Sequence, residues 1–237
     1  LYFPITKLVA RIIYSKSKIV TVSDKIKAKI YANYGFDDIT TMYNPIDFSA
    51  IENSLDTDDK LDFEYIIAAG SLKNNIKQFD VLLSCYHQSI LPSKGIKLVF
   101  MGDGVLLKHL KQLACDLHLQ DNVVFLGRKQ NPFPYYKEAK CTVLTSKNEG
   151  FPMVLIESLA TGTPVISYDC DSGPSEIIQN GLNGWLVADQ NPQKMTDALN
   201  EMVENEKLYL HCKANSKQSV ASFSLESIGE NWLTLLK

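Results

Sequence analysis

The chain has 237 residues, 45% of them hydrophobic and 22% charged, with a formal net charge of -3. This composition is that of an ordinary globular protein and excludes a disordered, collagen-like or coiled-coil chain. The length is large for one domain and small for two, since domains cluster near about 100–150 residues, and no apolar run reaches the roughly 18 residues that a transmembrane helix needs.

The first 46 residues predict two helices and two strands in alternation. Apolar residues at helical spacing favour a helix over 5–13, and short β-like runs favour strands over 19–22 and 39–43. Between the two strands, Ser23 has the position of a helix N-cap residue and Gly35 that of a helix end.

From residue 63 onward, strands that are apolar throughout alternate with helices. The strands are expected at 63–69, 97–101, 123–126, 141–145, 164–167 and 185–187, and the helices at 76–89, 105–117, 151–161, 174–180, 192–204, 206–219 and 224–236. This alternation predicts a parallel sheet covered on both faces, in a Rossmann-like doubly wound α/β domain. Ligands of such sheets bind at the carboxyl ends of the strands, where the glycine-rich and polar loops of this chain fall.

One of these loops has the residues of an anion site. A strand ends before Glu149, Gly150 turns the chain, and a helix begins whose free amides at 153–155 and dipole attract a phosphate. Glu149 and Glu157 frame this site, and because a phosphate repels carboxylates, they are expected to accept hydrogen bonds from hydroxyls. A sugar nucleotide, with phosphates between two polyols, fits this arrangement. The alternative is that Glu149 caps the helix and Glu157 is an exposed helical residue.

Several motifs extend this pattern along most of the chain. Glu149 and Glu157 are separated by seven residues and followed by the segments 159–166 and 173–178. Further motifs lie upstream: Val20-Thr21-Val22-Ser23, Asn44-Pro45-Ile46-Asp47, Gly70-Ser71-Leu72, Met101-Gly102-Asp103-Gly104 and Phe125-Leu126-Gly127-Arg128. In this order and spacing they resemble the retaining glycosyltransferases of family 4, which have the GT-B fold. The sub-type is similar to bacterial enzymes that build lipopolysaccharide, capsule or other surface glycans.

The resemblance implies the C-terminal half of a GT-B fold. Residues 1–46 would be a remnant of the N-terminal acceptor domain, and the acid-rich segment 47–62 would be a linker. Residues 63–222 would form the nucleotide-sugar-binding domain, and 223–237 the C-terminal crossover helix. A complete enzyme of two such domains needs well over about 300 residues, so this chain alone is expected to bind a donor without full activity.

The resemblance also implies a role for each residue of the site. Glu157 would hold the ribose hydroxyls, and Glu149 would contact hydroxyls of the transferred sugar as a catalytic residue. The backbone around Gly127 and Arg128 would read the edge of the base. The other nucleotide-sugar-binding residues would wall the nucleotide or hold the diphosphate and sugar: Ser71, Gly102, Gly104, Gly150, Phe151, Pro152, Met153 and Val154.

The loop after the first strand of this domain departs from the family pattern. The family has an arginine where this chain has Ser71, and its lysine in the same loop comes one residue earlier than Lys77. Lys77 is the candidate catalytic cation that neutralises the leaving diphosphate, and Lys73 is a competing candidate. Such charge stabilisation is usually the largest catalytic contribution, about 3–4 kcal/mol for one well-placed contact.

The implied activity is that of a hexosyltransferase. It would move a sugar from a nucleotide diphosphate, expected to be UDP, to a glycan or lipid-linked acceptor with retained anomeric configuration. No metal and no other cofactor is expected, because the metal-like tripeptide 169–171 leads into a loop that the GT-B resemblance explains without metal. Two alternatives stay open: a sugar-nucleotide epimerase or phosphorylase of the same architecture, and a non-catalytic nucleotide-binding module.

Cysteine usage and local charge bear on location and partners. Five cysteines without a C-x-x-C pair favour free thiols in a reducing cytoplasm. Residues 1–29 hold seven basic residues and one acidic residue, which leaves two interpretations: a solvated helix face, or peripheral contact with anionic lipid on the inner face of the cell membrane. Nucleic acid is not an expected partner, because a chain that binds it would be basic overall.

Overall fold

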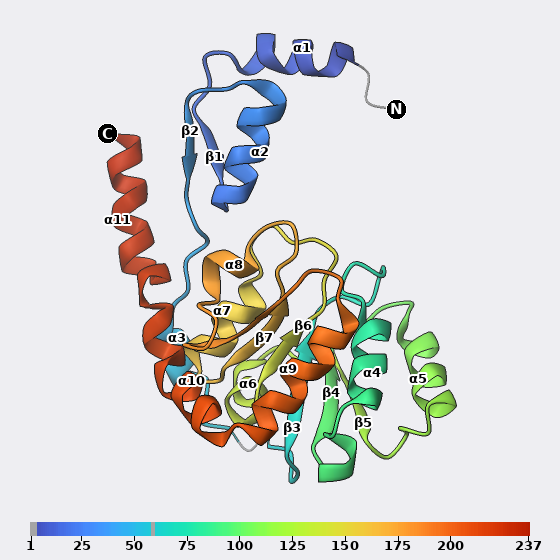
Figure 1. Ribbon diagram of the computed structural model, residues 1–237. Coiled ribbons are helices and arrows are strands. Elements are labelled where there is room, and N and C mark those ends of the chain that lie inside the picture. The colour runs from blue at the N-terminus through green and yellow to red at the C-terminus, as the bar shows by residue number, and fades with distance from the viewer. Residues whose placement is uncertain (1–3, 58–59) are drawn as a thin grey trace.

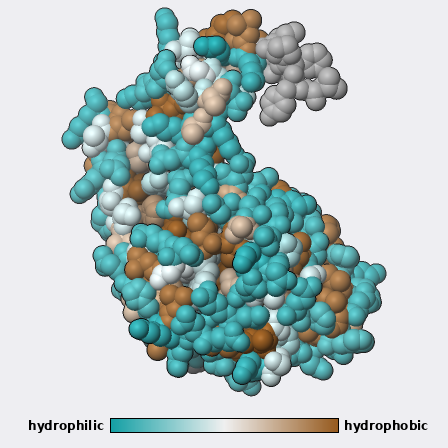
Figure 2. All heavy atoms as spheres, in the orientation of Figure 1, coloured by the Kyte–Doolittle hydropathy of each residue, from teal (hydrophilic) through white to brown (hydrophobic). Residues whose placement is uncertain are grey.

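The computed structural model describes residues 4–57 and 60–237. Residues 1–3 of the expected acceptor-domain remnant and residues 58–59 of the expected linker lie outside the described residues. A small N-terminal unit stands above a larger α/β domain (Figure 1). Figure 2 shows the same division as an upper lobe joined to a broad body by a narrower column.

The N-terminal unit has two helices and two strands: α1 (Pro4–Tyr14), β1 (Ile19–Thr21), α2 (Asp24–Tyr34) and β2 (Ile39–Thr41). The strands pair in parallel, with α2 as their connection. The Ser23 hydroxyl accepts a hydrogen bond from the Ile26 amide at 3.2 Å, which confirms the expected N-cap. Gly35 ends α2 with a φ of 65°, the left-handed conformation that favours glycine. The elements predicted for this unit are confirmed in type and order.

The expected linker, residues 47–62, contains the helix α3 (Phe48–Asn53), which the sequence did not predict. Asp47 caps it, since its Oδ1 accepts a hydrogen bond from the Ala50 amide at 2.8 Å. Ile51 is buried in an apolar cluster of the main domain. Asp47, one of the acidic residues that suggest an exposed linker, therefore caps a helix that packs against the main domain.

The main domain is built on a six-stranded parallel sheet: β3 (Tyr65–Ala69), β4 (Lys97–Met101), β5 (Val123–Gly127), β6 (Thr142–Leu144), β7 (Val165–Tyr168) and β8 (Gly184–Val187). Its strand order is β5-β4-β3-β6-β7-β8, and every pair is parallel. The Rossmann-like doubly wound α/β fold is therefore confirmed. The order reverses between β3 and β6, so the loops that follow these two strands flank the place where such sheets bind their ligands.

Helices cover both faces of this sheet: α4 (Phe79–Gln88), α5 (Leu107–Asp116), α6 (Phe133–Glu138), α7 (Met153–Ala160), α8 (Pro174–Ile177), α9 (Pro192–Glu204) and α10 (Glu206–Ser219). Side chains of α4, α5 and α9 pack on one face together with Ile66 and Leu98. Side chains of α6 pack on the other face with Tyr65 and Val99. The strands are apolar throughout because both of their faces are buried.

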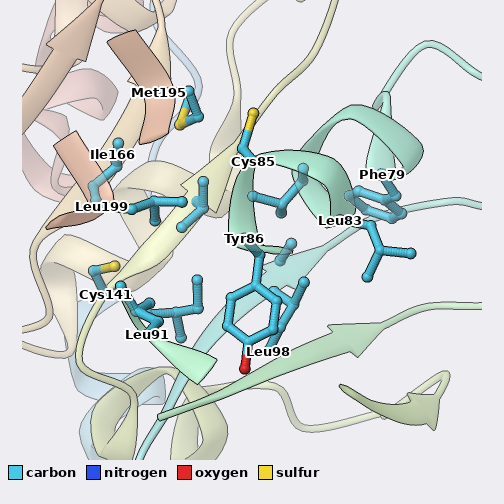
Figure 3. Packing of buried hydrophobic residues seen from close by; sticks show 14 of the residues in the cluster. Phe79, Leu83, Cys85, Tyr86, Leu91, Leu98, Cys141, Ile166, Met195 and Leu199 are labelled. Atoms are coloured by element: carbon cyan, nitrogen blue, oxygen red, sulfur yellow. The ribbon is translucent and has the colours of Figure 1, made fainter. Parts of the chain in front are cut away.

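The larger apolar cluster joins elements far apart in the sequence (Figure 3). Leu83 and Tyr86 of α4 lie near Leu98 of β4, while Leu199 of α9 lies near Ile166 of β7 (Figure 3). The Tyr86 hydroxyl donates a hydrogen bond to the carbonyl of residue 96 at 2.8 Å, so its burial leaves no unpaired donor. This core fixes the strand ends relative to one another.

Two glycines after β4 are required by a close approach of two backbones. A Cβ at Gly102 would lie 1.8 Å from the carbonyl oxygen of Gly70, and a Cβ at Gly104 would lie 2.3 Å from the carbonyl carbon of Leu72. Both glycines also have φ near 150°, a conformation that other residues rarely adopt. The loops that follow β3 and β4 are thus held together at the backbone level.

The chain ends in α11 (Leu225–Leu236), which returns to the N-terminal unit (Figure 1). At its start, the Leu225 amide donates a hydrogen bond to the Ile46 carbonyl at 3.0 Å, and the Ile46 amide donates one to Phe223 at 2.8 Å. Near its end, the Lys18 ammonium donates to the Leu235 carbonyl at 3.4 Å. Among the described residues, no helix is both long and apolar enough to cross a membrane.

Candidate functional site

A cleft of about 490 Å³ opens at the carboxyl ends of β3, β4 and β5. Four of the predicted binding residues line it together: Ser71, Gly102, Gly104 and Arg128. Lys73 and Tyr136 also line it. Residues of three separate loops therefore converge on one concave surface beside the reversal of strand order, where doubly wound sheets bind nucleotides.

The two predicted catalytic residues form an ion pair at this reversal point. Lys77 follows β3, Glu149 follows β6, and the Lys77 Nζ lies 2.6 Å from the Glu149 Oε1. The side chains are only 22% and 12% exposed, and the Ser146 hydroxyl donates to the same carboxylate oxygen at 2.6 Å. Partial burial strengthens such a charge-assisted contact. The pair thus places one cation and one carboxylate between the loops that follow β3 and β6, and neither residue lines the cleft itself.

The loop that carries Lys77 is tied to the loop that carries Glu149. The Thr145 hydroxyl donates a hydrogen bond to the Lys77 carbonyl at 2.9 Å, and the Lys147 amide donates one to the Ile76 carbonyl at 2.9 Å. The competing candidate, Lys73, is exposed and lies on the wall of the cleft instead. The structure therefore brings Lys77, and not Lys73, into contact with the Glu149 loop.

The turn from Gly150 into α7 has two of the three amides that the sequence predicts to be free. The Leu155 amide, expected to be free, donates to the Pro152 carbonyl at 3.0 Å in a tight first turn. The amides of Met153 and Val154 come before any residue of α7 that could accept from them within the helix. These two amides, and not three, are the donors that a phosphate would meet.

Phe151, between the turn and the helix, has a packing role. Its side chain is buried, and its ring centroid lies 5.0 Å from that of Tyr43 and 5.4 Å from that of Phe223. Val154 packs against the apolar clusters on this face of the sheet. The predicted binding role of the segment 150–154 therefore rests on its backbone.

Glu157 is half-buried, which contradicts the alternative that it is an exposed helical residue. Burial raises the pKa of this carboxyl above its ordinary value, and a hydrogen bond with the Tyr136 hydroxyl acts in the opposite direction. Tyr136 itself lines the cleft. Glu157 therefore lies next to a residue that lines the cleft.

Tyr136 makes a contact with Glu157 that the sequence did not indicate. The sequence leaves two interpretations for Phe133, Tyr135 and Tyr136, a border of the base pocket or an aromatic loop that packs, and the structure places all three in the helix α6. Tyr135 and Tyr136 are indeed buried against the sheet. The hydrogen bond from Tyr136 to Glu157 joins two residues 21 positions apart, and no local pattern announces it.

Gly127 connects the strand ends. Its φ is 68°, and its carbonyl accepts a hydrogen bond from the Gly102 amide at 2.9 Å. The next residue, Arg128, is exposed on the cleft wall. Gly127 thus turns the chain so that Arg128 reaches the predicted base pocket.

The metal-like tripeptide 169–171 is engaged in ion pairs with α2. The Lys25 ammonium lies 2.9 Å from Asp169, and Lys29 is paired with Asp171. Burial raises the pKa of the intervening Cys170 thiol to about 11. In residues 4–57 and 60–237, no group of three or more His, Cys, Asp or Glu side chains is arranged to hold a metal ion.

The basic residues of the N-terminal unit have separate neighbours. Lys25 and Lys29 face acids of the main domain, and Lys18 contacts the end of α11. Arg11 lies over Gly35, where the carboxyl end of α2 favours a cation. Three of the seven basic residues in 1–29 therefore have partners in other parts of the chain.

The six-stranded parallel sheet, with helices on both faces, has the fold of solved GT-B glycosyltransferases. A family model described as glycosyl transferases group 1 matches residues 52–219. The match extends over well more than half of the chain, so the chain belongs to this family.

Relatives and solved structures agree with this assignment. An uncharacterized glycosyltransferase of Haemophilus influenzae is 29% identical over 92% of this chain and 61% of its own length. The N-acetylgalactosamine-N,N'-diacetylbacillosaminyl-diphospho-undecaprenol 4-alpha-N-acetylgalactosaminyltransferase of Campylobacter jejuni is 32% identical over 82% of this chain and 52% of its own length. HepE of Anabaena, solved in complex with UDP, has a TM-score of 0.85 at 18% identity, over 99% of this chain and 67% of that one. The chain thus spans only about half to two thirds of these proteins.

Proposed function

We propose that this chain is the donor-binding part of a hexosyltransferase that takes its sugar from a nucleotide diphosphate, with UDP as the nucleotide. The observation that carries the proposal is the grouping at the reversal of strand order. There the Lys77–Glu149 pair joins the loops after β3 and β6 just ahead of the two amides of α7, and the half-buried Glu157 of α7 is hydrogen-bonded to Tyr136, which lines a 490 Å³ cleft. The UDP complex of a protein with the same fold supports the choice of nucleotide.

Each group has a part in the proposed reaction. Glu157 accepts hydrogen bonds from the ribose hydroxyls, while the amides of Met153 and Val154 donate to the diphosphate. Lys77 neutralises the charge that develops on the leaving phosphate, and Glu149 holds hydroxyls of the transferred sugar. Electrostatic stabilisation of the leaving group supplies most of the catalysis in such a site. The anomeric configuration is retained, and the donor diphosphate is held by these residues without a metal or other cofactor.

The proposed acceptor is a glycan or a lipid-linked sugar. The name of the Campylobacter jejuni relative states a diphospho-undecaprenol acceptor, which supports this class. Residues 1–46 would belong to an acceptor-binding domain, and α11 would return to it. We therefore expect donor binding from these 237 residues without full transfer activity.

Calorimetry with UDP, UDP-sugars and GDP-sugars tests the proposal. We expect UDP and at least one UDP-sugar to bind with a dissociation constant well below about 1 mM, that is, with more than about 4 kcal/mol of binding free energy. GDP compounds are expected to bind at least about tenfold more weakly. If no nucleotide binds below the millimolar range, the site is wrongly assigned. Conversion of the donor without any acceptor would instead favour an epimerase or a phosphorylase.

We further propose a cytoplasmic protein whose α1 contacts anionic lipid. On this helix Leu8, Ile12 and Ile13 are all more than 60% exposed, and Lys7 is exposed beside them. An amphipathic helix of this kind binds at the interface of a membrane. Contact through α1 replaces the broader basic segment 1–29, in which Lys18, Lys25 and Lys29 have partners elsewhere in the chain.

Sedimentation with vesicles measures this contact. We expect the chain to bind vesicles that contain phosphatidylglycerol, and to be released as salt rises above about 0.5 M, because screening weakens the attraction. Ile12→Asp is expected to abolish binding. Leu210→Asp, at a similarly exposed position on α10, serves as the control. Equal binding of both variants, or binding to neutral vesicles alone, would contradict the assignment.

A further inference from the structure

The N-terminus of α2 is capped by a carboxylate of the main domain. The amides of Asp24 and Lys25 donate to the two oxygens of Glu176 at 2.7 and 3.3 Å. Glu176 belongs to α8, more than 150 positions along the chain, and α8 lies beneath the lower end of α2 in Figure 1. A carboxylate at a helix N-terminus is stabilised by the free amides and the helix dipole. The two parts of the molecule are therefore joined by a directional contact.

Tyr43 lies between the carboxylates of Asp24 and Glu176. The contact formed by Tyr43, Glu176 and the start of α2 is called the junction below. The Tyr43 hydroxyl lies 3.1 Å from the Asp24 Oδ2 and 3.1 Å from the Glu176 Oε2. Burial and both carboxylates raise the pKa of Tyr43 above its ordinary value, so the phenol keeps its proton at neutral pH. The Thr41 hydroxyl donates to Asp24 at 2.5 Å from the same strand end. The hydroxyl of Tyr43 thus separates two negative charges and offers them a shared donor.

The same residues reach the anion-binding turn by two routes. The ring of Tyr43 packs on Phe151, the residue after Gly150. From the α8 side, a Cβ at Gly173 would lie 2.4 Å from the Pro152 Cδ, so the loop before α8 presses on the turn. The neighbouring Ser172 hydroxyl donates to the backbone carbonyl of Glu149. Both ends of the junction therefore touch the segment 149–152.

We propose that Tyr43 and Glu176 are positioning residues that couple the placement of the N-terminal unit to the geometry of the anion-binding turn. The junction holds α2 over α8, and through Phe151 and Pro152 it holds the amides of Met153 and Val154 where the diphosphate binds. The effect of this coupling on diphosphate binding rests on the proposed function. Its structural part, the link between α2 and the turn, is independent of any ligand.

Hydrogen exchange of the ligand-free chain tests that structural part. Tyr43→Phe removes the hydroxyl and keeps the ring on Phe151, and Glu176→Gln keeps an acceptor while removing the charge. We expect exchange to accelerate about tenfold both at the start of α2 (24–27) and in the turn (150–155), since a lost hydrogen bond to a charged group has about this effect. Tyr31→Phe and Glu204→Gln, at exposed positions on α2 and α9, are expected to change neither peptide.

The UDP affinity of the same variants tests whether the junction positions the amides that bind the diphosphate. We expect Tyr43→Phe and Glu176→Gln each to weaken UDP binding about threefold to tenfold, and the double variant to be no weaker than the poorer single variant, since they act through one junction. Faster exchange at 24–27 together with unchanged exchange at 150–155 would overturn the coupling. Unchanged UDP affinity in both variants would overturn the positioning role. Absence of UDP binding by the unaltered chain would refute the proposed function, while the exchange data would still decide whether the junction is coupled to the turn.

Discussion

Glu157→Gln is expected to weaken UDP binding at least about tenfold and, at the same time, to raise the melting temperature of the ligand-free chain by about 2–4 °C. Burial raises the pKa of Glu157 above its ordinary value, so the empty site carries a carboxylate that is costly to ionise. Glutamine removes this cost and still offers an acceptor to Tyr136. It loses the charge that strengthens hydrogen bonds from the ribose hydroxyls.

The difference in melting temperature between Glu157→Gln and the unaltered chain is expected to depend on pH. A group whose pKa is raised by folding stabilises the folded state fully below its unfolded pKa, and this contribution is lost as pH rises through the folded pKa. The melting temperatures of the two proteins should therefore converge at pH below about 4 and separate towards neutral pH. Glu204→Gln, exposed on α9, should show no such separation. A Gln variant that binds UDP like the unaltered chain would remove Glu157 from the ribose site.

Lys77→Met is expected to weaken UDP binding about a hundredfold and to lower the free energy of unfolding by about 1–3 kcal/mol. The loss of stability arises because Glu149, only 12% exposed, would keep the Ser146 hydroxyl but lose its counter-charge. The loss of affinity arises because the cation for the diphosphate is gone. The two effects have different origins, so they can be separated.

A double variant makes that separation. Lys77→Met combined with Glu149→Gln should recover most of the lost stability, because no unpaired charge is left, but none of the UDP affinity. Lys73→Met is expected to weaken UDP binding less than about tenfold, as for an exposed cation on the cleft wall. Lys207→Met on α10 controls for the loss of a surface charge. A larger loss of affinity in Lys73→Met than in Lys77→Met would make Lys73 the cation of the site.

Much of the fold was predictable because its signals are local. The apolar strands alternate with amphipathic helices, and the predicted limits of β4, α9 and α10 coincide with the observed ones. The helices α3 and α6 were not predicted, because each spans six residues and owes its stability to burial. Pro132 and Pro134 make the start of α6 look like a loop, and only its packing on the sheet distinguishes it.

The sequence indicates candidate residues for the site, but not the contacts between them. The spacing of Glu149 and Glu157 and the turn at Gly150 are visible in the sequence. The ion pair of Lys77 with Glu149 depends on β3 and β6 being neighbours, which strand order alone decides. The Leu155 amide was misjudged because the first turn of α7 closes on Pro152.

The junction of Tyr43 with Glu176 has no signal in the sequence at all. The two residues are 133 positions apart and belong to different parts of the molecule. Glu176 is a helical acid and Tyr43 an ordinary strand-end aromatic when each is considered alone. Their roles appear only when α2 is placed above α8.

The most direct measurement of the central claim is a crystal structure of this chain with UDP. We expect the ribose hydroxyls within hydrogen-bonding distance of the Glu157 carboxylate, and the diphosphate at the amides of Met153 and Val154 with Lys77 beside it. Diphosphate density away from the start of α7, for example between α2 and the loop 169–171, would contradict the assignment of the donor site.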